Sequence, residues 1–173
     1  MGFGAFCAAI RSDALRAVAR PWEDARGGRS VPAWRDIDPV EIGRNLRYVW
    51  SWRYDRATDS FTGRLAGEEI DRAFGKSLRG VPMRDFYAPD IYDLVYPRHR
   101  RVAVEPGFMH GYGMIFAHMG RSVVGERIVM PLAEDGRTGD GILGATIYRP
   151  IPHAERPLGP DFKPEQVTFF PLD

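Results

Sequence analysis

The segment "LRYVWSWRYD", residues 46–55, constrains the fold more than any other part of the chain. Its large apolar side chains alternate with small or charged ones, which is the two-residue period of a β-strand. The alternating set is Leu46, Tyr48, Trp50, Trp52 and Tyr54. Aromatic rings bury roughly 150–250 Å² each when they are covered. This face must therefore lie against a pocket, the first helix or a partner, and we favour packing in the core over direct ligand contact.

The residues that follow predict an antiparallel hairpin. The polar turn "DRATDS" leads into a second strand in which Phe61, Gly63 and Leu65 alternate. The next stretch, "RLAGEEIDRAFGKSLRG", residues 64–80, leaves that strand through Gly67 into a short acidic helix that ends at Gly75. A phosphate-binding loop is not expected here, because the spacing of these two glycines is wrong and the acidic side chains between them would repel phosphate.

An amphipathic helix is expected over residues 1–20. Its apolar residues recur at three- and four-residue steps, namely Phe6, Ile10, Ala14, Leu15 and Val18. Pro21 should end or kink this helix, because proline lacks the amide hydrogen that a helix interior requires. After a loop rich in glycine and proline, Asp38 and Pro39 predict the N-cap and the first residue of one short helical turn.

A second helix is expected after residue 90. The stretch "VPMRDFYAPD", residues 81–90, is an extended connector or a short helix, and Asp90 can cap the helix that follows it. One face of that helix carries Ile91, Leu94, Val95, Arg98 and Val102. Pro97 should kink the helix or divide it in two. The basic run at 98–101 predicts a solvated helix face rather than a contact with phosphates.

Three antiparallel strands and a tail are expected in the remaining residues. The strands are "FMHGYGMIFAHM", "SVVGERIVMPL" and "GILGATIYR", separated by a tight turn at Gly120 and Arg121 and by a polar loop. Residues 150–173 contain six of the fourteen prolines and predict an extended tail. Within the tail, "VTFFPL" has the composition to dock as a strand.

The expected fold is α+β, a five-stranded antiparallel sheet with short helices on one face. This order of elements resembles the PAS fold. The segments "WEDARGGRSVPAWRDIDPVEI", "FTGRLAGEEIDRAFGKSLRG" and "ERIVMPLAEDG" are similar to successive motifs of a bacterial PAS subfamily whose domain often forms nearly the whole protein. The expected organisation is a helix over 1–20, a PAS-like domain over 21–150 and a proline-rich tail over 151–173.

The resemblance implies a sensory or adaptor module without catalytic activity. PAS domains bind small molecules, haem or flavin between the sheet and the short helices, or bind nothing and mediate dimers, and residues 64–80 would wall such a pocket. We expect a homodimer that acts on a separate signalling protein. Two rival functions stay open. One is a small enzyme that uses the same pocket, which a buried carboxylate beside His118 or Tyr148 would favour. The other is a structural dimer module with a filled core.

The candidate ligand-binding residues come from the sheet. Arg64 would matter most for an anionic ligand, because a partly buried guanidinium needs a partner. The full candidate set is Tyr48, Trp50, Trp52, Arg64, Met114, Phe116, His118 and Tyr148. No catalytic residue is predicted, since no G-x-S-x-G elbow and no acidic pair stands out.

No metal site is predicted from the four histidines. His110 and His118 would stand about 26 Å apart on an extended strand, too far to chelate one ion. Haem-binding PAS domains place an axial histidine on the long helix, where His99 lies, yet His99 falls on the flank of the apolar stripe among arginines. We therefore expect a surface histidine there and no haem. Flavin photochemistry is not expected, because Cys7 is the only cysteine.

The composition predicts a cytoplasmic protein. Lysine plus arginine number 24 and aspartate plus glutamate 23, a net charge of +1 that gives no field for nucleic acid or a membrane surface. A lone cysteine fits a reducing compartment. The N-terminus lacks the pattern of a signal peptide, and no apolar stretch has the roughly 18 residues of a membrane-spanning helix.

Overall fold

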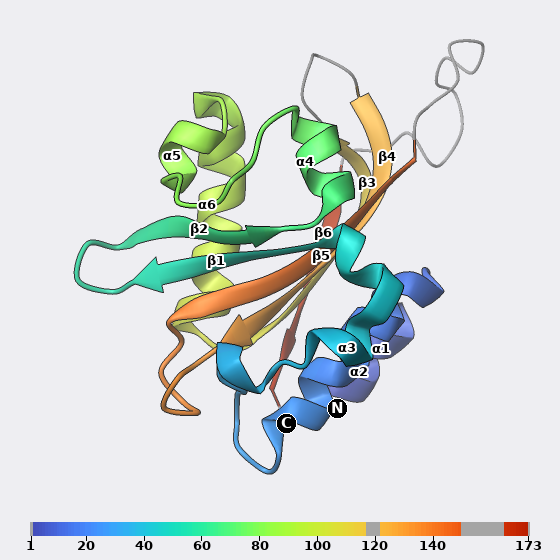
Figure 1. The fold of residues 1–173 in the computed structure, drawn as a ribbon, viewed down its shortest axis with the longest axis vertical. Helices are drawn as coiled ribbons and strands as arrows, with labels where there is room; N and C mark the ends of the chain where they lie inside the picture. The colour runs from blue at the N-terminus through green and yellow to red at the C-terminus, as the bar shows by residue number, and fades with distance from the viewer. Residues whose placement is uncertain (1, 117–121, 150–164, 173) are drawn as a thin grey trace.

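The computed structural model describes residues 2–116, 122–149 and 165–172, and Figure 1 shows their arrangement. The tight turn expected at Gly120 and Arg121 lies outside the described residues. The chain forms α1 Gly2–Ala9, α2 Asp13–Arg26, η1 Trp34–Asp36, α3 Pro39–Ile42, η2 Gly43–Tyr48, β1 Val49–Asp55, β2 Ser60–Ala66, α4 Glu68–Phe74, α5 Met83–Phe86, α6 Pro89–Val104, β3 Gly107–Phe116, β4 Ser122–Leu132, β5 Gly141–Arg149 and β6 Gln166–Pro171.

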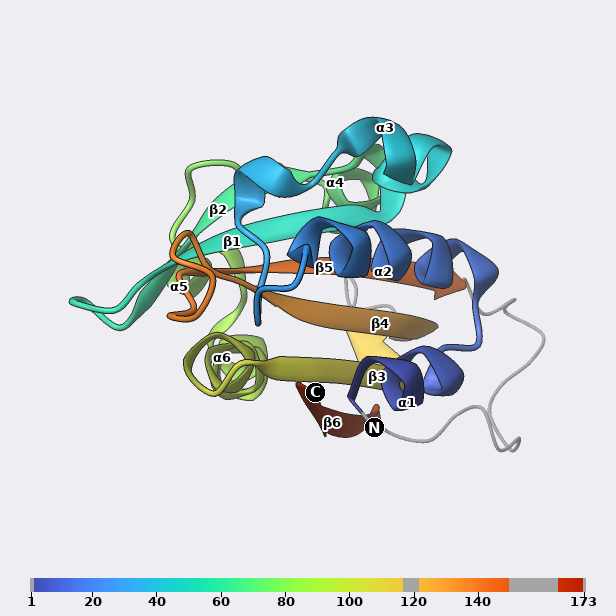
Figure 2. The ribbon, with the colours of Figure 1, turned by 90° about the horizontal axis from the view of Figure 1, so that it is seen from below.

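One antiparallel sheet forms the centre of the molecule. Its strand order is β2-β1-β5-β4-β3-β6, which Figure 2 shows from top to bottom. The hairpin of β1 and β2 and the meander of β3, β4 and β5 were both expected from the sequence. β1 pairs with β5, so the hairpin extends the meander into a continuous sheet.

Helices cover both faces of the sheet. In Figure 1 the helices α1 to α3, in blue to cyan, lie on one side, and α4 to α6, in green to yellow-green, lie on the other. Consecutive strand residues alternate between the two resulting cores: Ile128 packs with the N-terminal helices and Val129 with the later ones. The N-terminal helices therefore pack across the sheet and complete a three-layer domain.

The N-terminal segment forms two helices, whereas the sequence predicted one over residues 1–20. Ser12 adopts an extended backbone and separates α1 from α2. The amides of Arg11 and Ser12 donate to the Glu126 carboxylate at 2.6 and 2.9 Å, so a distant strand residue satisfies them in place of a helix. α2 also continues past Pro21 to Arg26, so the domain boundary expected at residue 20 falls inside this helix.

Burial explains why α2 tolerates its internal proline. Proline in a helix interior costs about 3 kcal/mol, because one backbone hydrogen bond is lost. Pro21 is buried, and the nearby Val18 and Trp22 are fully buried in the core between the N-terminal helices and the sheet. The Trp22 indole Nε1 donates to the Pro131 carbonyl at 2.7 Å and fixes this part of α2 to β4. Packing thus offsets the missing bond.

Pro39 begins α3, and the Asp38 carboxylate accepts from the Val40 amide, as the sequence predicted. α6 runs without a break from Pro89 to Val104, so of the two outcomes predicted for Pro97, a kink or a division of the helix, the division does not occur. Its N-cap is Ala88, and Asp90 lies in the first turn without a capping bond.

A sixth strand adds to the five expected. β6 pairs antiparallel with β3 from Tyr112↔Gln166 to Gly107↔Pro171, at the edge of the sheet. Val167 and Phe169 pack against the core beneath α6, and Phe170 packs against the opposite core. The end of the predicted tail is therefore part of the domain, whereas residues 150–164 lie outside the described ones.

Candidate functional site

A cavity of about 290 Å³ lies between the later helices and the sheet. Pockets for small molecules have volumes of roughly 300–1,000 Å³, so this cavity is of the smallest ligand-binding size. It is lined by Phe74, Tyr87, Ile91, Leu94, Val95, Arg98, Met114, Ile115, Arg127 and Glu165. Most of these side chains are apolar, and the charged ones are few.

The apolar wall follows from the pattern of α4 and α6. Ile91, Leu94 and Val95 recur at helical spacing and turn one face of α6 toward the cavity. Phe74 is the last residue of α4, where Gly75 in the left-handed conformation, with φ 67°, ends the helix. The turn predicted at residues 64–80 therefore supplies part of the cavity wall.

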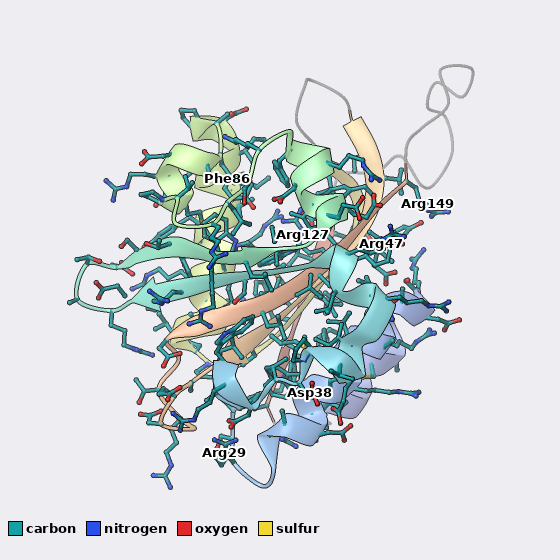
Figure 3. The ribbon with its side chains drawn as sticks, in the orientation of Figure 1. Arg29, Asp38, Arg47, Phe86, Arg127 and Arg149 are labelled. Carbon is teal, nitrogen blue, oxygen red and sulfur yellow. The ribbon has the colours of Figure 1, made fainter. Side chains whose placement is uncertain are left out.

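Three charged side chains meet at the cavity. Glu165, directly before β6, accepts a hydrogen bond from Arg98 Nη1 on α6 at 2.7 Å, and its other oxygen lies 3.3 Å from Arg127 Nε on β4. The side chains of Glu165 and Arg127 are only 7% and 9% exposed, and that of Arg98 is 22% exposed. Figure 3 shows Arg127 in the interior near α4, whereas Arg29 and Arg149 lie at the periphery.

A glycine makes room for the buried carboxylate. Gly111 on β3 pairs with Arg127 on β4 and with Val167 on β6. A Cβ atom at Gly111 would overlap the Glu165 carboxylate. The absence of a side chain at Gly111 therefore lets Glu165 reach the two arginines.

Two tyrosines add hydroxyl groups near the charged cluster. Burial raises the pKa of Tyr148 to about 12, with the Arg127 charge opposing and the Glu165 charge adding to the rise. Burial also raises the pKa of Tyr87 well above its usual value. Both rings contact Phe74, at centroid distances of 5.7 Å for Tyr87 and 6.4 Å for Tyr148. Both hydroxyls are protonated at neutral pH and can donate hydrogen bonds.

Of the candidate binding residues, Met114 lines the cavity and Tyr148 lies beside it. Trp50 and Trp52 belong to the same core but outside the cavity lining. The Trp50 indole donates to Thr146 Oγ1 at 2.9 Å, and the Trp52 ring meets Phe86 edge-on at 5.6 Å. The two tryptophans thus pack in the core between the sheet and the later helices, next to the cavity rather than in its wall.

Two other candidates lie away from the cavity. Tyr48 ends the 3₁₀ helix η2 and packs with the N-terminal helices, because the strand begins only at Val49. The Arg64 guanidinium lies 4.8 Å from the centre of the Trp34 ring in η1, on that same side. The Phe116 side chain and all of His118 lie outside the described residues.

The prediction of a surface histidine at position 99 was wrong. His99 is fully buried, with its ring 5.0 Å from that of Trp50 and 6.5 Å from that of Phe61. Among the described residues, neither ring nitrogen has a hydrogen-bond partner. Burial lowers the pKa of His99 well below its usual value, and the Arg127 and Arg98 charges lower it further. The imidazole is therefore a neutral core residue.

A second buried ionisable pair lies on the opposite face of the sheet. Glu126, the residue before Arg127 on β4, contacts His110 Nε2 on β3 at 2.8 Å and holds the amides that separate α1 from α2. Burial alone would raise the pKa of Glu126, but the hydrogen bonds from His110, Arg11 and Ser12 together lower it. This pair therefore anchors the N-terminal helices to the sheet.

Beyond the wall expected from residues 64–80, sequence reasoning missed Tyr87, Arg127 and Glu165 as cavity residues. The alternation along β4 gives one usable signal, because it places Arg127 on the same face as Val129. A charged residue at an inward position of a central strand needs a buried partner. The sequence does not indicate that Glu165, from the proline-rich tail, is that partner.

Within residues 2–116, 122–149 and 165–172, no group of three or more histidine, cysteine, aspartate or glutamate side chains is placed to hold a metal ion. In the same ranges, no helix combines the length and the apolar character needed to cross a membrane.

Comparison with known proteins identifies the fold family. A family model described as PAS domain matches residues 10–147, which is most of the chain. No curated protein and no solved structure matches the chain. The matched range contains helices that cover both faces of the sheet, and it contains every cavity residue except Glu165. The six-stranded antiparallel sheet with its short helices agrees with that assignment. The chain belongs to the PAS domain family.

Proposed function

We propose that this PAS domain is a sensory or adaptor module that binds a small, mainly apolar ligand in the cavity, without turnover. The observation that carries the proposal is the cavity of about 290 Å³ between α6 and the sheet. In the proposed role the domain works in the cytoplasm, as a homodimer, and transmits the occupancy of the cavity to a separate signalling protein.

The cavity counts against a purely structural dimer module. Such a module would be expected to fill its core, since protein interiors are close-packed and contain few voids larger than a water molecule. Here the space is lined by an apolar wall with a few convergent polar groups, the usual composition of a ligand site.

The alternative of a small enzyme receives some support from Glu165. It is a buried carboxylate whose charge acts on Tyr148, which is the juxtaposition that would favour catalysis. However, each carboxylate oxygen faces an arginine, and the nearby tyrosines are protonated at neutral pH. These groups are suited to holding a ligand by charge and hydrogen bonds, and they supply no poised acid and base.

Ligand binding can be tested by filling the cavity. Val95→Trp would project an indole into it, whereas Val40→Trp makes the same change on α3, where Val40 is 81% exposed. Octan-1-ol is a suitable neutral apolar probe. At ten times its Kd it should stabilise the wild type by about 1.4 kcal/mol, which raises Tm by roughly 3–6 °C.

The Val40→Trp protein should respond to octan-1-ol like the wild type, and the Val95→Trp protein should not respond. Native mass spectrometry of the purified wild type should in addition show a small bound molecule that the Val95→Trp protein lacks. Equal thermal shifts in all three proteins would place the alcohol elsewhere and contradict the proposal.

A further inference from the structure

The charged cluster at the cavity has an excess of positive charge. Arg98 and Arg127 share one carboxylate, that of Glu165. The bonding of the buried pair is also incomplete, because within the described residues neither Arg127 Nε nor Glu165 Oε1 has a hydrogen-bond partner, despite their 3.3 Å separation. An arginine in an apolar site is stabilised by a well-placed anion. The cluster therefore has the chemistry to accept a second carboxylate or to exchange its own.

The carboxylate now in place belongs to a replaceable segment. Glu165 directly precedes β6, which in the described part of the chain pairs with β3 and forms an edge of the sheet. By contrast, Arg98 lies in the middle of α6, and Arg127 lies on β4, which is paired on both sides. If another anion takes the place of Glu165, the arginines stay fixed and the N-terminal end of β6 loses its anchor.

The cavity volume limits the size of the anion. One water molecule occupies about 30 Å³ of liquid, so a volume of about 290 Å³ holds roughly ten non-hydrogen atoms. Its wall of Phe74, Ile91, Val95 and Met114 is apolar, which matches a hydrocarbon tail and excludes a polar body.

On the basis of the proposed function, we propose that the ligand is a small amphipathic monocarboxylate with about eight carbons in all, the carboxyl carbon included. Its tail lies against α6, and its carboxylate replaces that of Glu165 between Arg98 and Arg127. The displaced Glu165 releases the N-terminal end of β6 from the sheet. Occupancy of the cavity is thereby converted into a change at the sheet edge, where a partner can detect it.

The charge requirement can be tested with two isosteric probes, octanoate and octanamide, by calorimetry at pH 7.5. A charge-assisted hydrogen bond raises the affinity of a ligand by roughly 10- to 100-fold over a ligand that lacks it. Octanoate should therefore bind tighter than octanamide by about that factor. Arg98→Met should abolish most of this preference and leave octanamide binding within about twofold. The result to compare between the two proteins is the ratio of the octanamide Kd to the octanoate Kd, rather than either Kd alone.

Glu165→Gln tests the exchange directly. It removes the internal competitor, so octanoate should bind about tenfold tighter than to the wild type, while octanamide is unchanged. A merely structural role for Glu165 would weaken both ligands. The matched control is Glu105→Gln, the same change at an exposed residue that makes only a 3.8 Å ion pair with Arg101. It should alter neither affinity.

Hydrogen–deuterium exchange reports on β6. Saturating octanoate should raise exchange in the peptide that contains Gln166 and Val167 by about fivefold or more, whereas octanamide should not, and β1 and β5 should be unaffected. Equal affinity for the two probes, or unchanged β6 exchange with octanoate bound, would overturn this inference while leaving apolar ligand binding intact. Binding of neither probe, together with no response to octan-1-ol, would overturn both proposals.

Discussion

His99 provides the sharpest test of the packing beneath α6, because its burial makes folding stability depend on pH. In the folded protein the imidazole is fully buried, has no hydrogen-bond partner in the part of the chain that the structure describes, and stays neutral. In the unfolded chain it takes up a proton below its ordinary pKa of about 6.5. The folded-state pKa is therefore depressed, and stability falls as pH drops below the unfolded-state value.

The size of the effect follows from that linkage. At pH 5.5, one unit below the unfolded-state pKa, protonation of the unfolded chain lowers the free energy of unfolding by about 1.4 kcal/mol relative to pH 8. His99→Leu removes this loss and replaces two unsatisfied nitrogens with an apolar side chain of similar volume. At pH 8 the variant should be at least as stable as the wild type. At pH 5.5 the difference between their free energies of unfolding should be larger than at pH 8 by about 1.4 kcal/mol.

Urea unfolding followed by tryptophan fluorescence at both pH values measures this difference. His110→Leu is the matched control, because it makes the same change at a buried histidine that has a partner. It should be less stable than the wild type at pH 8, since Glu126 loses the His110 hydrogen bond. A stability difference between His99→Leu and the wild type that is the same at pH 5.5 and pH 8 would refute the burial of a neutral imidazole.

Three further predictions concern stability. Glu126→Gln should lower the free energy of unfolding by about 3 kcal/mol at pH 7, measured by urea unfolding, because an amide cannot accept hydrogen bonds from Arg11, Ser12 and His110 together. Since the folded-state pKa of Glu126 is lowered, this loss of stability should shrink as pH falls below about 4.5, and a loss that does not change with pH would contradict the prediction. Gly111→Ala should cost about 2 kcal/mol through overlap with Glu165, whereas Gly4→Ala in α1, where a Cβ meets no atom within 4 Å, should be neutral or stabilising by thermal denaturation. Trp22→Phe should lower Tm by roughly 4–12 °C, because it leaves the Pro131 carbonyl unpaired and a void beside α2; a shift below about 2 °C would argue against that contact.

Most of the sheet could be predicted because its signals are local. The alternation of large residues through Trp50 and Trp52 and the turn residues between strands mark each element without reference to distant parts of the chain. Helices on both faces of the sheet were not predicted, because the expected fold placed the short helices on one face, although β3, β4 and β5 have few polar positions.

The errors come from contacts between distant segments. The break between α1 and α2 depends on Glu126, which lies more than 110 residues away in the sequence. His99 lies beside three arginines in the sequence, and only the packing of α6 over Trp50 and Phe61 shows that it is buried. The site is harder still to predict, because Glu165 joins Arg127 only after β6 has paired with β3.

Glu126 and Arg127 are consecutive on β4, yet one anchors the N-terminal helices and the other binds Glu165 at the cavity. A slip of β4 by a single residue against its neighbours would exchange the two faces and would set a carboxylate against Glu165 and a guanidinium against His110. Both exchanges bury charges without suitable partners. The two sites together therefore oppose a one-residue slip and help to fix the register of β4 in the sheet.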